Sequence, residues 1–194
     1  APNLTVGTNV TGATPQILGY NMGTFWEGSN TPDWWRYAGV NAARMFLHPN
    51  NFPLQGKDSV TSSSQFLEQK AAVQSDPLGY ASIDWATFAD RFANRNILSG
   101  GVAQRYKADH TIGTLRQMGI GTLMQVTASE GFFPVADTND WGGKWQMWKH
   151  YYAMAFHLAR YFDVHRYQMF NEPDHPNANG LLPSNWLMRL QLVR

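Results

Sequence analysis

The chain contains no cysteine among its 194 residues, which excludes disulfides, thiolate metal sites and cysteine nucleophiles. The chain is also nearly neutral, with 15 Lys and Arg, 14 Asp and Glu, and a net charge of +1. Its basic residues form no cluster in the sequence. Binding to nucleic acid therefore has no electrostatic support. The sequence also has no apolar run that approaches the roughly 18 residues of a membrane span, so we expect no membrane partner.

Aromatic side chains, by contrast, are abundant. They make up 14% of the chain, with 8 Trp, 8 Tyr and 11 Phe. Two interpretations stay open. One is a large aromatic core, which suits a hydrophobic content of 43% and a length sufficient for one folded domain. The other is a carbohydrate site, because flat aromatic faces stack on the apolar C–H faces of pyranose rings.

Short apolar runs alternate with longer helical patterns along the chain. Strands are predicted at residues 16–20, 42–47, 122–126 and 167–170. Helices are predicted at residues 32–38, 85–95, 110–118 and 144–162, with a last one from residue 183 onward. The Ser- and Gln-rich stretch at residues 58–65 is typical of an exposed loop. Four βα units in succession predict an α/β fold with a parallel sheet.

Polar residues interrupt three of these apolar strands, at Arg44, Gln125 and Gln168. Alternation with a period of two puts Gln168 on the same face of its strand as Glu172. A buried polar group without a partner costs roughly 1–3 kcal/mol. A barrel interior supplies such partners, because inward side chains meet there in layers. No GxGxxG pattern follows Gly19, so we predict a (β/α)8 barrel of the TIM type and not a doubly wound sheet.

The tip of the fourth strand carries the leading catalytic candidate. Barrels of this type place their active sites at the C-terminal ends of the strands, and the fourth apolar run ends in Asn171, Glu172 and Pro173. A carboxyl group held there beside aromatic residues can acquire the raised pKa of a general acid. Asn171 can donate a hydrogen bond to a substrate hydroxyl, and Pro173 fixes the backbone just beyond. The alternative is that Glu172 caps the next element or pairs with His175 or Arg44.

The other strand ends supply candidates for sugar binding. Trp26 lies in a polar loop, so we expect it to be a platform for a sugar ring. Trp141 lies between turn residues and is either a platform or a loop anchor. His48 and His175 either bind substrate or have a structural role. Glu130 is either a second active-site carboxylate or an ordinary loop residue. The remaining tryptophans lie on predicted helices and are expected mostly to pack: Trp34, Trp35, Trp85, Trp145, Trp148 and Trp186.

Several other site types lack their sequence patterns. The chain has no HxH, HExxH or EF-hand spacing, so we predict no metal site and no other cofactor. It also has no GxSxG elbow, which argues against a serine hydrolase.

The tripeptide Asn171-Glu172-Pro173 after a fourth strand resembles the acid/base motif of the retaining (β/α)8 glycoside hydrolases of clan A. The resemblance implies that Glu172 is the general acid/base, that Asn171 contacts the substrate 2-hydroxyl, and that Arg44 supports the nucleophile. Within the clan, the stretch from Leu18 to Phe46 is most similar to the agarase and porphyranase group, family 86. A β-galactan polysaccharide is then the expected substrate.

The resemblance also implies a part that this chain does not supply. A retaining mechanism needs two carboxylates about 5–5.5 Å apart, and the nucleophile of the clan ends the seventh strand. A complete barrel takes roughly 250 residues, so we expect residues 1–194 to form the N-terminal half of the catalytic domain. Three explanations stay open: a fragment of a longer enzyme, a half barrel that pairs with a second copy, or a binding module without hydrolysis.

The N-terminal residues bear on the cellular location of the protein. The chain begins with Ala1-Pro2 and not with Met, as a processed export product or a trimmed chain would. We therefore expect a secreted or periplasmic protein.

Overall fold

The structure is a computed structural model that describes residues 16–22, 31–47, 54, 59–94, 96–99, 102–125, 139–168 and 191. In chain order its elements are β1 (Gly19–Met22), α1 (Thr31–Tyr37), β2 (Ala42–Phe46), α2 (Ser63–Ser75), α3 (Trp85–Asn94), β3 (Asn96–Ser99), β4 (Val102–Lys107), α4 (Ala108–Gln117), β5 (Gly121–Gln125), α5 (Trp141–Phe162) and β6 (Arg166–Gln168).

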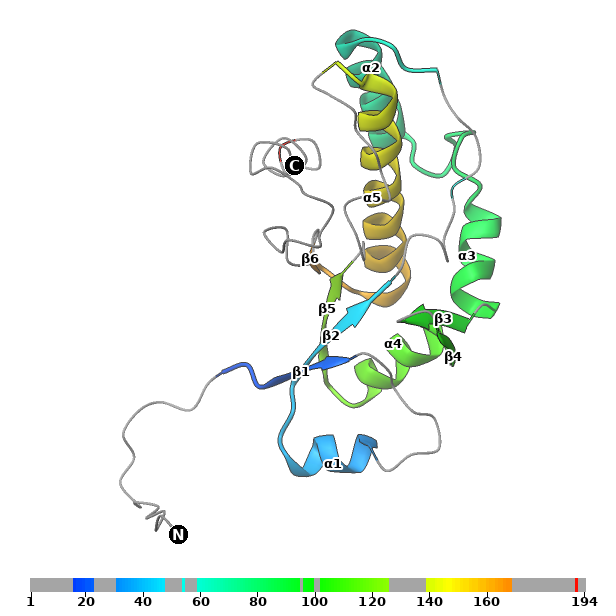
Figure 1. Cartoon of the computed structure of the whole chain (residues 1–194). Coiled ribbons are helices and arrows are strands. Elements are labelled where there is room, and N and C mark those ends of the chain that lie inside the picture. Colours follow the sequence, from blue (N-terminus) through cyan, green and yellow to red (C-terminus); the bar gives the residue numbers. More distant parts are fainter. Residues whose placement is uncertain are drawn as a thin grey trace.

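Four strands form one parallel sheet in the order β1-β2-β5-β6 (Figure 1). Each strand lies beside the next sheet strand in the sequence, and at least one helix separates the two along the chain. Right-handed crossovers in such an order put the connecting helices on one face of the sheet. A doubly wound sheet instead reverses its order at a switch point. The predicted α/β class with a parallel sheet is therefore confirmed.

The two faces of the sheet differ in burial. On β2, Ala43 and Met45 are 1% and 4% exposed and belong to the hydrophobic core, whereas Arg44 and Phe46 are half-buried. Met45 pairs with Met124 of β5, which is fully buried. Successive strand residues point to opposite faces, so the core lies on the face of the methionines. We call the opposite face, which carries Arg44 and Phe46, the inner face.

The aromatic core is built along α5. Trp145, Trp148 and Tyr152 stack with successive ring centroids 5.4 and 5.0 Å apart, since positions three and four apart share one side of a helix. Phe66 of α2 meets Trp145 and Trp148 edge-on, at 6.1 and 6.4 Å. Both tryptophans are buried. For this part of the chain, the abundance of aromatic residues reflects packing.

Four predicted helices are confirmed with small shifts of their ends, as α1, α3, α4 and α5. Two glycines mark the ends of α1 and α4. Gly39 has a φ of 68° and Gly119 a φ of 73°, in the left-handed region that residues with a Cβ rarely adopt. The first strand lies at residues 19–22 and not at 16–20. The helix predicted from residue 183 lies outside the described residues.

The prediction of a loop at residues 58–65 is wrong from Ser63 onward, where α2 begins. The side chain of Ser62 accepts a hydrogen bond from the backbone N–H of Gln65 at 3.3 Å. In return, the side chain of Gln65 accepts from the backbone N–H of Thr61 at 2.8 Å. These reciprocal bonds resemble a capping box, whose Ser-x-x-Gln signature is visible in the sequence.

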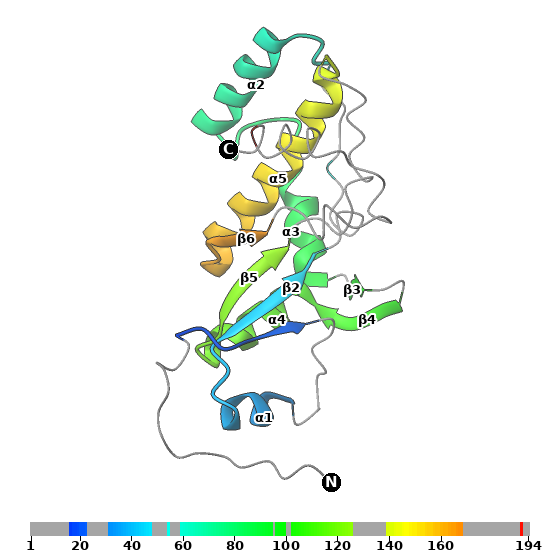
Figure 2. The same cartoon turned by 60° about the vertical axis from the view of Figure 1, so that its left-hand side comes forward.

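A second element without a prediction is the antiparallel pair of β3 and β4, which forms a separate two-stranded sheet. In the sequence, Gly100-Gly101 separates the two strands. A two-glycine connection between strand-forming runs is a hairpin signal. Figure 2 shows the pair beside α4, which follows β4 directly in the chain.

One tryptophan departs from the expected packing role. Trp35 on α1 is 8% exposed, but its neighbour Trp34 is 61% exposed. Trp85 is half-buried, and its indole N–H donates to the backbone carbonyl of Pro77 at 2.6 Å. Packing therefore accounts for Trp35 and Trp85 and is wrong for Trp34. Trp186 lies outside the described residues.

Candidate functional site

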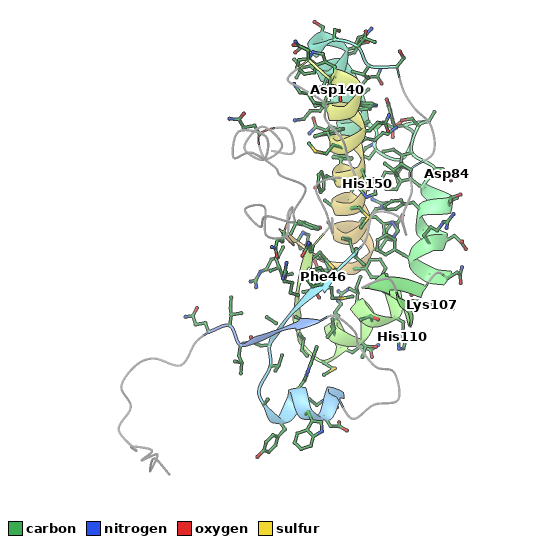
Figure 3. The ribbon with its side chains drawn as sticks, in the orientation of Figure 1. Phe46, Asp84, Lys107, His110, Asp140 and His150 are labelled. Atoms are coloured by element: carbon green, nitrogen blue, oxygen red, sulfur yellow. The ribbon has the colours of Figure 1, made fainter. Side chains whose placement is uncertain are left out.

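The inner face carries polar side chains toward the C-terminal ends of the strands. Phe46 of β2 pairs with Gln125 of β5, and Gln125 pairs with Gln168 of β6. These three residues are the last of their strands. Because the four strands of this sheet are parallel, their C-terminal ends lie along one edge of it. Figure 3 labels Phe46 at this edge.

Arg44 connects two strands on the inner face. Its Nη2 donates a hydrogen bond to Oε1 of Gln125, and its guanidinium lies 4.4 Å from the ring centroid of Phe46. Gln125 is fully buried. The polar strand residues thus meet on one face, as the period-two alternation predicts. Gln125 is absent from the predicted site residues. Its sequence signal is that it interrupts an apolar strand, as Arg44 and Gln168 do, but its position beside Arg44 depends on the register of β2 and β5.

Removal of the Gln125 amide tests how much this pair contributes. We expect Gln125→Ala to lower the free energy of unfolding by about 1–3 kcal/mol, because a guanidinium donor then loses a buried acceptor. Urea titration followed by tryptophan fluorescence measures the change. Gln117→Ala on the exposed surface of α4 is the matched control, expected within about 0.5 kcal/mol of the unaltered chain. Equal stabilities of the two variants would contradict the assignment.

Trp141 is the other predicted site residue within the described ranges, and it is the first residue of α5. Its ring lies 5.9 Å from that of Phe66, and Nζ of Lys144 lies 4.0 Å from its centroid. Asp140 before it caps the helix, since its side chain accepts from the backbone N–H of Gly143 at 2.8 Å. Of the two interpretations of Trp141, these contacts support the anchor.

The long helix α5 also supplies a wall beside the strand ends. Its 22 residues span about 33 Å, while the five residues of β5 span about 17 Å. The C-terminal end of α5 leads into β6, so its N-terminal part extends past the C-terminal edge of the sheet (Figure 1). Figure 3 labels Asp140 at that far end. α2 packs on this extension through Phe66.

The remaining predicted site residues lie outside the described residues: Trp26, His48, Glu130, Asn171, Glu172 and His175. Their roles stay predictions. Within the described ranges, no three His, Asp or Glu side chains gather as metal ligands would.

Two histidines of α5, neither of them a predicted site residue, are buried in the core. His150 and His157 are each 3% exposed, and burial lowers the pKa of His150 to about 3 and that of His157 to about 4. The ring of His157 lies 4.4 Å from that of Phe92 and 5.4 Å from that of Phe88. Within the described part of the chain, its Nδ1 has no hydrogen-bond partner. Both imidazoles are therefore neutral in the folded chain near pH 7.

Because both histidines are buried and neutral, we expect the free energy of unfolding to fall in acid. Unfolded histidine titrates near 6.5, so between pH 6.5 and about 4 the unfolded chain binds protons that the folded chain does not. The stabilising contribution is complete above pH 6.5. It falls as the pH drops toward the folded pKa, by up to about 1.4 kcal/mol per pH unit for each histidine.

The measurement is urea unfolding at pH 7, 6 and 5. His157→Phe, which removes one titrating group from among phenylalanine rings, is expected to flatten the pH dependence. A slope that His157→Phe does not alter would show that this imidazole is not the source.

Two hollows lie away from the strand C-terminal ends. One of about 360 Å³ lies on the inner face near the strand starts, with Gly19, Ala42 and Gly121 in its lining. The other, of about 470 Å³, lies between the end of α4 and the start of β6, with Arg116 and Asp163 in its lining. Of the predicted site residues within the described ranges, Arg44 lines the first hollow and Trp141 lines neither.

Comparison of the chain with protein-family models, with curated proteins and with solved structures finds no match. Of the helices in the described ranges, none has the length and apolar character needed to cross a bilayer.

Proposed function

We propose that this chain is the N-terminal half of a (β/α)8 glycoside hydrolase domain that cleaves a β-galactan of the agar or porphyran type with retention of configuration. Glu172 is the general acid/base, and the nucleophile lies outside this chain. The observation that carries the proposal is the sheet of four parallel strands in sequential order, whose inner face holds Arg44, Gln125 and Gln168. Asn171-Glu172-Pro173 follows shortly after the last of these strands.

The sequential strand order supports a barrel wall because it is the order in which a (β/α)8 barrel is wound. β6 ends at Gln168, four positions before Glu172 in the sequence. The hydrogen bond between Arg44 and Gln125 supports an interior of polar layers. The α5 extension supports a cleft, since it adds depth beside the strand ends.

The chemistry divides between two carboxyl groups. Glu172 donates a proton to the glycosidic oxygen while the nucleophile attacks the anomeric carbon and forms a glycosyl-enzyme. Glu172, now a carboxylate, then takes a proton from the water that hydrolyses this intermediate. Asn171 hydrogen-bonds the substrate 2-hydroxyl. The positive charge of Arg44 holds the nucleophile ionised and in place.

The enzyme is endo-acting, needs no cofactor, and works as a secreted or periplasmic protein. The residues proposed to contact the polysaccharide are Trp26, His48, Glu130 and His175.

A second candidate function is a carbohydrate-binding half barrel without hydrolysis. The described strand ends favour it in one respect. They place an aromatic ring and an amide group at one edge, at Phe46 and Gln168 on either side of the buried Gln125, without a carboxylate among the described residues of that edge. Such a set can hold a sugar but cannot protonate a leaving group.

Hydrolysis and binding assays separate the two functions. Agarose and porphyran oligosaccharides are incubated with the chain alone and with the chain joined to the βα units that complete the barrel. We expect new reducing ends from the completed barrel and none from the chain alone. Calorimetric binding without new reducing ends from the completed barrel would favour the binding module. Hydrolysis by the chain alone would contradict the proposal that the nucleophile lies outside this chain.

A further inference from the structure

The outer surface of α1 carries an aromatic pair that the core does not use. Trp34 is 61% exposed and Tyr37 is 87% exposed, while Trp35 between them is buried. The two exposed rings are in contact, with centroids 6.2 Å apart and planes at 90°. Two largely exposed aromatic rings side by side leave a large apolar area in water. Such a surface is typical of a binding site.

Completion of a barrel would leave Tyr37 exposed. Residues on a helix are about 100° apart, so Tyr37 lies about 160° around the axis from Trp35, which faces the core. A (β/α)8 barrel adds helices beside α1, within the same outer ring. No helix of that ring covers the side that faces away from the sheet. The exposure of Tyr37 is therefore independent of the half barrel that the proposed function places outside this chain.

The geometry of the pair suits a sugar ring. The perpendicular planes of the two rings form a corner. The π face of an aromatic ring is negative and attracts the slightly positive C–H groups of a pyranose. Asp33 and Arg36 on the same helix form an exposed ion pair at 2.8 Å, with side chains 78% and 60% exposed. Both can exchange hydrogen bonds with sugar hydroxyls.

We infer that Trp34 and Tyr37 form a second carbohydrate site, outside the catalytic cleft, that holds a chain of the β-galactan substrate. The inference rests on the proposed function for the identity of the sugar. α1 lies at the end of the molecule remote from α2 in both views (Figures 1 and 2), whereas α2 packs on the extension of α5 above the strand ends. The α1 site therefore tethers the polymer at a distance from the bond that is cut. Tethering raises the local concentration of polymer at the cleft.

Affinity electrophoresis of the whole chain tests the site. Native gels are cast with and without soluble agarose, and retardation is measured over a range of agarose concentrations. We expect Trp34→Ala with Tyr37→Ala to weaken the apparent affinity at least about tenfold, as loss of an aromatic anchor does at other binding sites. Tyr161→Ala, which removes a 54% exposed aromatic ring from α5, is the matched control and should migrate as the unaltered chain does.

Two outcomes overturn the inference. One is equal retardation of the double variant and the unaltered chain. The other is a chain that is dimeric in light scattering and becomes monomeric in the double variant, since a second copy then covers the pair. Glu172→Gln separates this site from the proposed hydrolysis, because it should keep the retardation. If retardation depends on Trp34 and Tyr37 but the completed barrel does not hydrolyse the polymer, the proposed function is wrong. The inference of a carbohydrate site on α1 is then still supported.

Discussion

Glu172→Gln is expected to lower kcat/KM on agar-type oligosaccharides by about 10²–10⁴-fold in the completed barrel. The amide keeps the size and most of the hydrogen bonding of the carboxyl group, but it cannot deliver a proton to the glycosidic oxygen. The alkoxide leaving group must then depart unprotonated. Release of reducing ends under initial-rate conditions measures the loss.

Two comparisons make this result specific to proton transfer. An aryl galactoside with a phenol leaving group of low pKa needs little protonation, so its glycosylation step should be far less affected by Glu172→Gln. Glu68→Gln, at an exposed position of α2, makes the same chemical change away from the strand ends and should retain full activity. Equal losses on the oligosaccharide and on the activated substrate would contradict the general acid assignment.

Trp145→Ala is expected to cost about 3–5 kcal/mol of unfolding free energy, the range for removal of a large buried aromatic side chain. Trp145 is fully buried and stacks on Trp148, with Phe66 and Tyr80 edge-on at 6.1 and 6.2 Å. Its loss leaves a cavity between α2 and α5. Since single domains are stable by about 5–15 kcal/mol, this one change removes a large share of the total.

Trp34→Ala is the control for this substitution, because it deletes the same side chain from a 61% exposed position. We expect a change within about 0.5 kcal/mol. Guanidinium titration with circular dichroism at 222 nm measures both variants. Comparable losses in the two would show that burial on α5 does not decide stability.

The strands of the parallel sheet and four of the helices are largely predictable from the sequence. The elements that the sequence does not predict are α2 and the pair of β3 and β4. α5 is found from its aromatic residues at steps of three and four, because a helix that packs along its length repeats that spacing. α2 has only two buried residues, Phe66 and Val73, so its core-facing pattern is too sparse for periodicity to detect. Its capping bonds at Ser62 and Gln65 are the stronger signal. The hairpin of β3 and β4 is likewise marked by its turn and not by its strands.

The candidate site divides in the same way. The face on which Arg44 and Gln125 meet follows from alternation along the strands, since the period of two is fixed by backbone geometry. The exposure of Trp34 does not, because two successive tryptophans on a short helix cannot both face the core, and nothing in the local sequence selects between them. The burial of His157 depends on Phe88 and Phe92 of α3, which are distant in sequence.

The stereochemistry of the first product tests the central claim most directly. Proton NMR of the completed barrel acting on an agarose oligosaccharide distinguishes the α and β anomers before they equilibrate. We expect the β anomer to appear first, as a double displacement requires. First appearance of the α anomer would contradict it, because inversion uses two carboxyl groups about 6.5–9.5 Å apart and no covalent intermediate.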